Sequence, residues 1–489
     1  MPLKMQRGFR ARPVSLGQAR AAQQIWARTR VKGRLAILRR ARHRIAATAE
    51  EIARTVPCEQ PGALHRTVAD TLVSEVLPLV EACRFLECEA AWILAPQRLN
   101  THNRPFWLRR QTAETRRDPL GVVLILAPAN CPLFLPGVQV LQALAAGNAV
   151  LWKPAPGGLG AAEALRDILV GCGLDPALLQ LLDESAHLAS EVASDAIAAG
   201  VDKVFLTGSA TTGTAVLHQL AEHLTPSVME LSGCDAVFVL PGADLDRTVA
   251  ALIFGLRLNG SATCMAPRRV FLIGDHPDFV RALLDQLERL PPVVLPAHTQ
   301  SQLTELLQDA RRLGGAVMKD ESDAGLRYAL ILRASSAMAI MQTDMFAPVL
   351  GIFDVPDTEA AIAAHGACRF RLTAAVFGPE REASELASQL PVGTVLINDL
   401  IVGTADPRIS FGGRKSSGFG LTRGREGLLE MTAFKTIVTQ RSRGRRAYQA
   451  TTPAHQPFFA GYIQAVHGGH WLARWHGLRR LLRAAARLG

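Results

Sequence analysis

The chain has 489 residues, more than a single hydrophobic core usually supports, so two or more domains are predicted. Its 48% hydrophobic and 20% charged residues are typical of a folded globular protein and exclude intrinsic disorder. No run of about 18 uncharged apolar residues occurs, which argues against a membrane-spanning helix. The eight dispersed cysteines show no disulfide or metal-ligand spacing, so a reducing, cytoplasmic location is expected.

The net charge of +11 is concentrated at the two ends of the chain. Residues 1–49 contain 13 Lys or Arg, residues 441–489 contain 9 Arg, and neither segment contains an acidic residue. The remaining chain has 32 basic and 43 acidic residues, so its body is acidic. This distribution argues against a nucleic-acid-binding core and indicates ends that contact an anionic partner or stay solvated.

Helical spacing of apolar residues predicts helices over Val31–Val56 and Thr67–Leu94, and Trp107–Arg117 alternates weakly, as in a hairpin. Gly121–Ala127 is continuously apolar, which predicts a strand buried on both faces. Helices are then predicted over 138–146, 160–171 and 190–199, alternating with strands over 149–152, 178–182 and 203–206. This alternation predicts a parallel sheet of the Rossmann type, which binds nucleotides at the carboxyl ends of its strands. A second α/β region is predicted from about Leu231 to Gly420.

Several motifs bear chemistry, although each alone also has a structural explanation. Thr207-Gly-Ser-Ala-Thr-Thr-Gly213 joins a strand to a helix, where glycines and a helix N-terminus suit a phosphate, or simply form a tight turn. Glu230 ends a short apolar run, and alone it is an ordinary strand terminus. Cys264 lies 34 residues later in a Gly/Ser/Ala-rich segment, and most cysteines are small buried hydrophobes. Asn130, between two prolines, is by itself a turn residue.

Taken together and in order, these motifs resemble the aldehyde dehydrogenase superfamily over roughly residues 20–440. The resemblance implies an NAD(P)-dependent dehydrogenase with Cys264 as nucleophile, Glu230 as general base and Asn130 as an oxyanion-hole donor. The cofactor-binding residues that it implies are Lys153, Thr207, Gly208, Ser209, Gly213, Asp344 and Phe346. The late glycine-rich signature Ser410-Phe-Gly-Gly-Arg-Lys-Ser-Ser-Gly418 also matches. Cys131 and Phe411 are expected to line the substrate pocket, and no metal is expected.

The chain departs from the usual pattern at several positions. Asp344 replaces the usual glutamate, which shortens its reach to the cofactor ribose by one methylene. Pro156 stands where an acid often binds the ribose hydroxyls. Because the loss of that acid removes a repulsion against a 2′-phosphate, NADP is admissible beside NAD.

The resemblance also implies a domain arrangement. Residues 1–100 and 120–230 are expected to form the cofactor-binding domain with N-terminal helices, and 231–420 the catalytic domain. Segments 101–119 and 430–441 are expected to make the oligomerisation element of a homodimer or homotetramer. Residues 442–489 form a basic tail, in which His470–Leu488 places two tryptophans and two leucines along one face of a cationic amphipathic helix. Such a helix suits an anionic membrane interface or the surface of the protein itself or a partner subunit.

Three functions remain open on the sequence alone. The leading one is hydrolytic oxidation of an aldehyde to a carboxylic acid through a thiohemiacetal and a thioester, and a lipophilic aldehyde would suit a membrane-associated tail. The second is a coenzyme A-linked acylating dehydrogenase or acyl reductase, for which Glu230 would not be needed. The third is a non-catalytic scaffold, which would have no reason to retain Asn130, Glu230 and Cys264 together. The identity of the aldehyde does not follow from the sequence.

Overall fold

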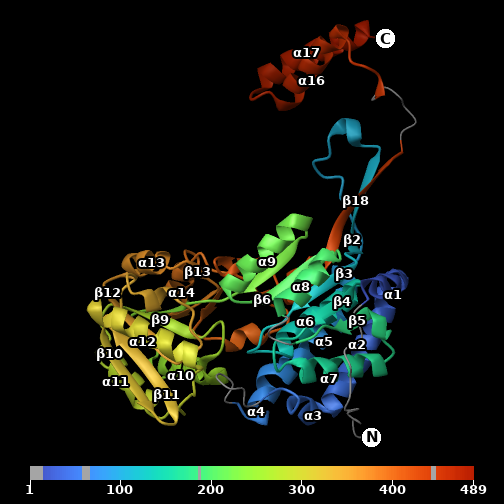
Figure 1. Ribbon diagram of the computed structural model, residues 1–489. Helices are drawn as coiled ribbons and strands as arrows, with labels where there is room; N and C mark the ends of the chain where they lie inside the picture. The colour runs from blue at the N-terminus through green and yellow to red at the C-terminus, as the bar shows by residue number, and fades with distance from the viewer. Residues whose placement is uncertain (1–14, 58–65, 185–188, 442–447, 489) are drawn as a thin grey trace. The chain divides into compact units, whose positions relative to one another are not determined.

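A computed structural model describes residues 15–57, 66–184, 189–441 and 448–488. The chain divides into two compact units, one comprising Met1–Pro96 and Arg116–Lys435 and the other Gln97–Thr115 and Thr436–Gly489. Figure 1 labels helices and strands of both units.

The larger unit contains a six-stranded sheet in the order β17-β7-β6-β3-β4-β5. Five strands are parallel, as predicted from the βαβα alternation, and β17 is antiparallel to β7. Burial of β3 and β4 on both faces explains their continuous apolar sequences. The strands are β3 (Val122–Leu126), β4 (Ala149–Lys153), β5 (Leu179–Leu181), β6 (Lys203–Gly208), β7 (Ser227–Leu231) and β17 (Gly418–Phe419).

Helices pack against this sheet and form one hydrophobic core with it. The crossover helices are α6 (Phe134–Ala146), α7 (Leu159–Gly171), α8 (Ala189–Ala198) and α9 (Ala210–His223), with the 3-10 turn η3 (Pro176–Leu178). The N-terminal helices are α1 (Leu16–Arg28), α2 (Val31–Ala47), α3 (Ala49–Ala53), α4 (Val68–Thr71) and α5 (Leu77–Ile93). A π-helical turn, η1 (Leu72–Val76), joins α4 to α5.

A second sheet of seven strands has the order β10-β11-β12-β9-β8-β14-β15 and is parallel except for β10. Its strands are β8 (Asp235–Val239), β9 (Pro267–Ile273), β10 (Ala316–Ser322), β11 (Gly325–Leu332), β12 (Val349–Val355), β14 (Thr373–Phe377) and β15 (Thr394–Ile397). The accompanying helices are α10 (Leu245–Arg257), η5 (Leu258–Ser261), α11 (Phe279–Leu287), α12 (Ala297–Arg312), η6 (Ala339–Gln342), α13 (Thr358–Gly366), α14 (Glu380–Ala387) and η7 (Val402–Ala405).

After this sheet, the chain returns to the first one. On the way, β16 (Arg414–Lys415) pairs with β13 (Phe370–Arg371), which precedes β14 in the chain, and β17 and α15 (Gly424–Glu430) follow β16. Gly418 lies opposite Glu230, and a Cβ there would come 1.9 Å from the carbonyl oxygen of Met229. Only glycine therefore fits where β17 pairs with β7, and this fit brings the late glycine-rich signature beside Glu230.

The smaller unit contains β1 (Gln97–Arg98), η2 (Phe106–Leu108) and parts of β2 (Gln111–Pro119) and β18 (Thr432–Gln440). β1, β2 and β18 form one three-stranded sheet, which includes the predicted hairpin segment. The unit also contains η9 (Pro453–His455) and two packed helices, α16 (Gln456–His467) and α17 (Trp471–Arg487). The sequence interpretation anticipated α17 but missed α16. The ring of Trp107 meets that of Tyr462 edge-on, with centroids 5.2 Å apart.

Candidate active site

The loop after β3 carries Asn130. Its side-chain Nδ2 donates a hydrogen bond to the carbonyl oxygen of Ala262 at 2.9 Å. In return, Nδ2 of Asn259 donates to the carbonyl oxygen of Asn130 at 3.3 Å. These reciprocal bonds join the edge of the first sheet to the segment that precedes Cys264.

That segment has a strained backbone. Asn259, Gly260 and Ser261 have positive φ values of 52°, 59° and 68°, and the two non-glycine residues are strained there. The buried guanidinium of Arg268 donates to Ser261 through Nη1 to Oγ at 2.8 Å and through Nη2 to the carbonyl oxygen at 2.8 Å. Its Nη1 also donates to the carbonyl oxygen of Ala347 at 3.1 Å. Strained residues cluster at functional sites, where surrounding contacts hold them, and this turn leads directly to Cys264.

Glu230 is buried near the end of β7, with 2% of its surface exposed. Its Oε2 accepts a hydrogen bond from Thr422 Oγ1 at 2.9 Å, while no hydrogen-bond partner is present for Oε1 among the described residues. Burial raises the pKa of this carboxyl above its ordinary value, and the Arg423 guanidinium and the hydroxyls of Thr422 and Thr207 oppose that rise. A carboxyl with a raised pKa and one free oxygen is suited to accept a proton.

Cys264 is partly exposed in the loop before β9. Burial raises the pKa of its thiol well above the ordinary value, and the carboxylates of Glu230, Asp235 and Asp344 add to the rise. Arg423 opposes it. The thiol is therefore neutral in this environment at neutral pH, and reaction as a thiolate requires a base or a nearby cation.

Sequence reasoning missed Arg423, because an arginine beyond a glycine-rich segment gives no signal of burial. Its side chain is buried, its Nη1 donates to the carbonyl oxygen of Thr404 at 2.7 Å, and its guanidinium lies over the Phe411 ring at 4.5 Å. It has a φ of 58°, a strained value for a non-glycine residue. The cation acts electrostatically on both Glu230 and Cys264.

Several of the side chains described above line one cavity of about 990 Å³. It is lined by all three expected catalytic residues, Asn130, Glu230 and Cys264, and by both expected pocket residues, Cys131 and Phe411. Apart from the charged groups, much of its wall is apolar, including Val73, Leu77, Phe134, Leu135, Phe254, Leu256, Met265, Leu290, Val293, Ile401 and Val402. Burial raises the pKa of the Cys131 thiol well above its ordinary value, as it does for Cys264, so this pKa does not distinguish a wall residue from a nucleophile.

Comparison with known proteins identifies this arrangement. Residues 15–437 match the aldehyde dehydrogenase family. The chain belongs to that family. It is an NAD(P)-dependent aldehyde dehydrogenase, as the sequence resemblance predicted, and an oxidoreductase rather than a non-catalytic scaffold.

Similar proteins act with either nicotinamide cofactor. The chain is 29% identical to a 4,4'-diapolycopene aldehyde oxidase from Methylomonas sp, over 76% of this chain and 72% of the relative. An NADP-dependent glyceraldehyde-3-phosphate dehydrogenase from Bacillus halodurans C-125, solved with NADP, superposes with a TM-score of 0.78 at 25% identity over 87% of this chain and 90% of that one. A betaine aldehyde dehydrogenase from Staphylococcus aureus, solved with NAD+, has the same fold with a TM-score of 0.78 at 19% identity, covering 89% and 88%.

In this aldehyde dehydrogenase the expected cofactor residues lie on two structural elements. Lys153 ends β4, Thr207 and Gly208 end β6 on the other side of β3, and Ser209 follows β6 directly. The Ser209 hydroxyl caps α9 by accepting from Thr212 N at 3.1 Å. A Cβ on Gly213 would come 2.8 Å from a terminal methyl group of Leu231, so any larger residue there requires the Leu231 side chain to move.

Asp344 and Phe346 lie on the loop between η6 and β12, outside the residues that line the large cavity. The Oδ1 atom of Asp344 is buried with no hydrogen-bond partner among the described residues, and burial raises the pKa of this carboxyl to about 6. The buried Lys153 ammonium donates only to the adjacent carbonyl of Pro154 at 3.2 Å among the contacts of the described chain. The unpartnered Oδ1 of Asp344 and the buried Lys153 ammonium, with the α9 N-terminus, fit a dinucleotide.

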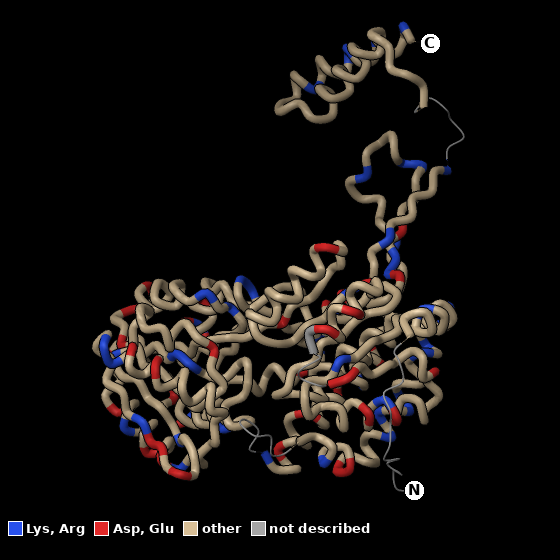
Figure 2. Tube along the Cα trace, in the orientation of Figure 1, with Lys and Arg blue, Asp and Glu red and all other residues tan. Residues whose placement is uncertain are grey.

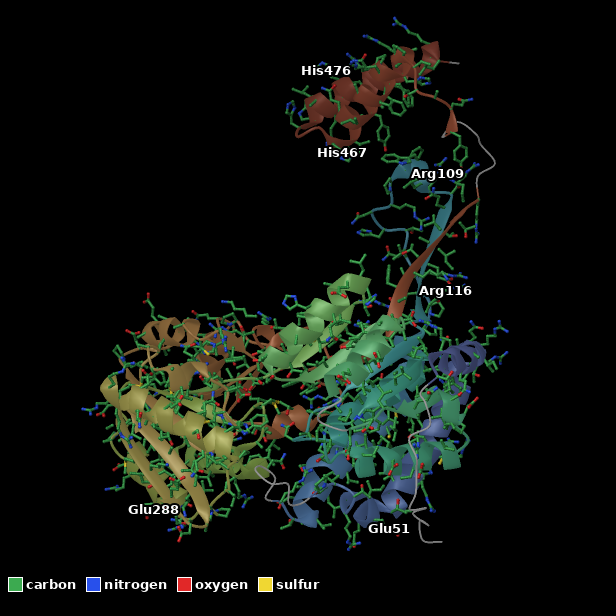
Figure 3. All side chains as sticks on the ribbon, in the orientation of Figure 1. Glu51, Arg109, Arg116, Glu288, His467 and His476 are labelled. Atoms are coloured by element: carbon green, nitrogen blue, oxygen red, sulfur yellow. The ribbon has the colours of Figure 1, made fainter. Side chains whose placement is uncertain are left out.

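No helix among the described residues is long and apolar enough to cross a membrane. The described residues likewise contain no group of three or more His, Cys, Asp or Glu placed to hold a metal ion. His467 and His476 are labelled on the two C-terminal helices, where both side chains are exposed (Figure 3).

Proposed function

We propose that Cys264 is the nucleophile of the dehydrogenase and that Asn130 and the Cys264 backbone N–H stabilise the oxyanion. The observation that carries this proposal is the shared cavity, on which Asn130, Glu230 and Cys264 all lie. The sulfur attacks the aldehyde carbon, its proton passes to a base, and the carbonyl oxygen becomes an oxyanion. Donors preset for that oxygen accelerate such a step by roughly 10²–10³ each. The Asn130 amide has a second N–H besides the one that it donates to Ala262.

Collapse of the tetrahedral thiohemiacetal re-forms the carbonyl and expels hydride, leaving a thioester on Cys264. The nicotinamide cofactor supplies the hydride acceptor when it is bound. Lys153, Thr207–Ser209, Gly213, Asp344 and Phe346 are the residues that would hold it. Water then attacks the thioester, Glu230 accepts the proton of that water, and the carbon–sulfur bond breaks to release the carboxylic acid.

Glu230 favours hydrolysis over transfer to coenzyme A. Its raised pKa and free Oε1 suit proton abstraction from water, whereas a thiol acceptor is acidic enough to need no such base. The test is the appearance of reduced nicotinamide with NAD or NADP and an aldehyde, without coenzyme A. Cys264→Ala is expected to abolish it, and Glu230→Gln to leave a single stoichiometric burst. A steady rate in Glu230→Gln, or a strict requirement for coenzyme A, would contradict the hydrolytic mechanism.

We further propose that the aldehyde is lipophilic. The cavity wall is mainly aliphatic and aromatic, and its volume suits a chain of many carbons. Similarity to a protein named for 4,4'-diapolycopene aldehyde supports this class. A series of n-alkanals is expected to show KM falling with chain length, because each buried CH₂ contributes about 0.8 kcal/mol. A preference for charged short aldehydes would contradict it.

The three-stranded sheet is proposed as the oligomerisation element of a homodimer or homotetramer. Phe434 and Val438 on β18 are 61% and 56% exposed, which is a high exposure for large apolar side chains. Light scattering of the purified protein tests this, and Val438→Glu is expected to lower the mass. The division of the larger unit into cofactor-binding and catalytic domains remains a proposal, supported by its two separate sheets.

We also propose that α16 and α17 contact an anionic membrane surface. They pack on each other through Gly461 and Gly477, where a Cβ would come within 3 Å of the facing backbone. The two helices contact each other through the face that carries these glycines. The apolar face of α17 is therefore not covered within this unit, and Trp471 is 73% and Leu482 60% exposed. The arginines of this pair of helices lie on α17, and neither helix carries an acidic residue (Figure 2). Tryptophan and arginine in this combination suit the interface of anionic lipids.

Co-sedimentation of the full chain with phosphatidylglycerol or phosphatidylcholine vesicles tests this contact. Binding to the anionic vesicles only is expected, and the double variant Trp471→Ser, Trp475→Ser is expected to weaken it at least about tenfold. Equal sedimentation with both lipids, or no effect of the double variant, would contradict the proposal.

A further inference from the structure

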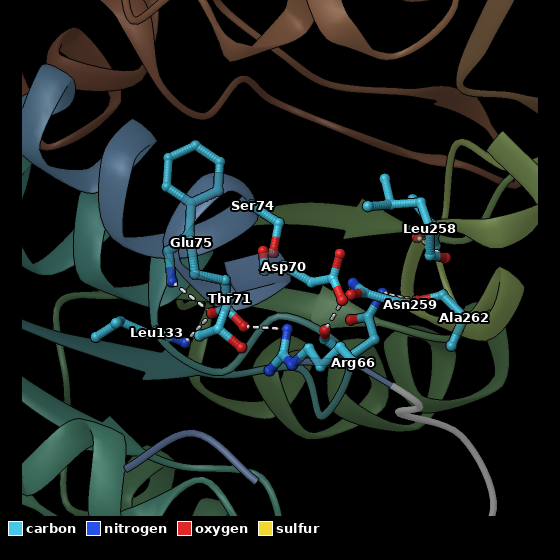
Figure 4. A network of polar contacts seen from close by, with 12 residues as sticks. Arg66, Asp70, Thr71, Ser74, Glu75, Leu133, Leu258, Asn259 and Ala262 are labelled. Atoms are coloured by element: carbon cyan, nitrogen blue, oxygen red, sulfur yellow. Dashed lines mark hydrogen bonds and ion pairs between the residues drawn. The ribbon is translucent and has the colours of Figure 1, made fainter. Parts of the chain in front are cut away.

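The N-terminus of α6 is capped by a residue from a distant part of the chain. Leu133 occupies the N-cap position and offers no polar side chain. Instead, Oε2 of Glu75 accepts hydrogen bonds from the backbone N–H groups of Leu133 at 2.7 Å and Phe134 at 3.0 Å. Figure 4 shows this carboxylate between the two elements. A carboxylate at this end of a helix satisfies two orphan donors and interacts favourably with the helix dipole.

Glu75 is completely buried, and its other oxygen is paired with Arg66. The Arg66 Nη1 and Glu75 Oε1 atoms are 2.5 Å apart, with side-chain exposures of 1% and 0% (Figure 4). Arg66 also lines the large cavity. Burying an ion pair carries a desolvation cost that a local Ser, Thr or Asp cap at position 133 would avoid. The helix cap alone therefore does not account for this pair.

The capped turn is the one that bears Asn130, three residues before Leu133. On its other side, Asn130 is bonded to Asn259 and Ala262, in the strained turn before Cys264. The Asn130 loop is thus held at both ends, by the Glu75 carboxylate and by the nucleophile's own loop. Glu75 itself lies in the π-helical turn η1, an irregularity that often marks functional sites.

We infer that Glu75, balanced by Arg66, is a positioning residue that fixes the Asn130 amide at the oxyanion site. This inference rests on the proposed role of Asn130. Glu75 does not touch the substrate in this scheme; it acts by anchoring Leu133 and Phe134, and through them the preceding turn. A displacement of about 1 Å at a reacting group costs up to about a hundredfold in rate. Loss of the anchor should accordingly lower kcat more than it raises KM.

Glu75→Gln is expected to lower kcat about tenfold and change KM less than about twofold, because it keeps the shape but removes the charge that holds both N–H groups. Glu87→Gln is a matched control. Glu87, on α5, forms a less buried ion pair with Arg42 at 2.7 Å and does not line the cavity. It is expected to keep the wild-type kcat. An equal loss of kcat in both variants would overturn the inference.

A double-mutant cycle with Asn130→Ala separates positioning from structural support. If Glu75 acts through Asn130, Glu75→Gln costs about tenfold in the wild-type background and nearly nothing in Asn130→Ala. Equal costs in both backgrounds would overturn the inference and leave the role of Asn130 intact. An Asn130→Ala variant with wild-type kcat would instead refute the proposed oxyanion role, and the inference with it. If Glu75→Gln does not fold, the same cycle is measured with Glu75→Asp, which keeps the charge and shortens the reach.

Discussion

Thr422→Val is a sharp test of how the general base is tuned. The Thr422 hydroxyl lies 2.9 Å from Glu230 Oε2 and 3.2 Å from the carbonyl oxygen of Phe411. The hydroxyl has one proton to donate. Glu230 Oε2 is the stronger acceptor of the two oxygens, because it is nearer and can carry a negative charge. Donation favours the ionised carboxylate, so it lowers the pKa of Glu230 against the rise that burial causes. Removal of the hydroxyl should therefore raise that pKa further.

The size of the shift follows from the hydrogen bond. A hydrogen bond to a charged group contributes roughly 1.5–3 kcal/mol, and one pKa unit corresponds to about 1.4 kcal/mol. The pKa of Glu230 should rise by about one to two units in Thr422→Val. Glu230 is active as a base only when ionised, so the acid limb of the kcat–pH profile should move to higher pH by that amount. The plateau at high pH should change little, because the ionised base is then fully present.

The assay is kcat for aldehyde oxidation across the pH range at constant ionic strength. Thr422→Ser keeps the hydroxyl and should leave the acid limb in place. Thr404→Val is a matched control, because Thr404 is buried on the same cavity but its hydroxyl donates to Ile401 O at 2.6 Å, not to Glu230. If the acid limb of the kcat–pH profile of Thr422→Val stays within about 0.3 pH units of that of the wild type, the reasoning is refuted. The Thr422 hydroxyl would then donate its proton to the carbonyl oxygen of Phe411.

Three further predictions concern other groups. Arg423→Met should raise the pKa of the Cys264 thiol further, because a buried cation that opposes its rise is lost; iodoacetamide should then label Cys264 more slowly at a fixed pH, and an unchanged labelling rate would contradict this. Burial raises the pKa of Asp235 to about 7 from 3.8, so the native state holds this proton more tightly than the unfolded chain, and stability falls as pH rises through this window. In Asp235→Asn, the free energy of unfolding measured by urea titration should lose up to about 4 kcal/mol of that pH dependence. A difference in unfolding free energy between wild type and variant that is the same at every pH would refute this. Gly213→Val should weaken NAD(P) binding with little change in thiol reactivity, because a Cβ meets Leu231 at 2.8 Å, and unaltered cofactor titration would contradict this.

The local sequence determined most elements of the first sheet. The continuous apolar runs at Val122–Leu126 and 149–152 require strands buried on both faces, and helical spacing between them requires crossovers. The ordered motifs likewise indicated Asn130, Glu230 and Cys264, which the fold brings to one cavity. The helix α16 was missed because Gly461 in its middle weakens the helical pattern, and its stability comes from packing on α17.

Tertiary structure alone decided how the site is tuned. Thr422, Arg423, Glu75 and Arg66 carry no sequence signal, because a threonine, a glutamate or an arginine is ordinarily a surface residue. Each acquires its effect only by burial beside a group that is far away in the chain, such as Glu75 beside Leu133. Sequence patterns report periodicity within an element, whereas the electrostatics of a buried site depends on distances between elements. The motif residues were therefore readable from the sequence, and the residues proposed to set their pKa and position were not.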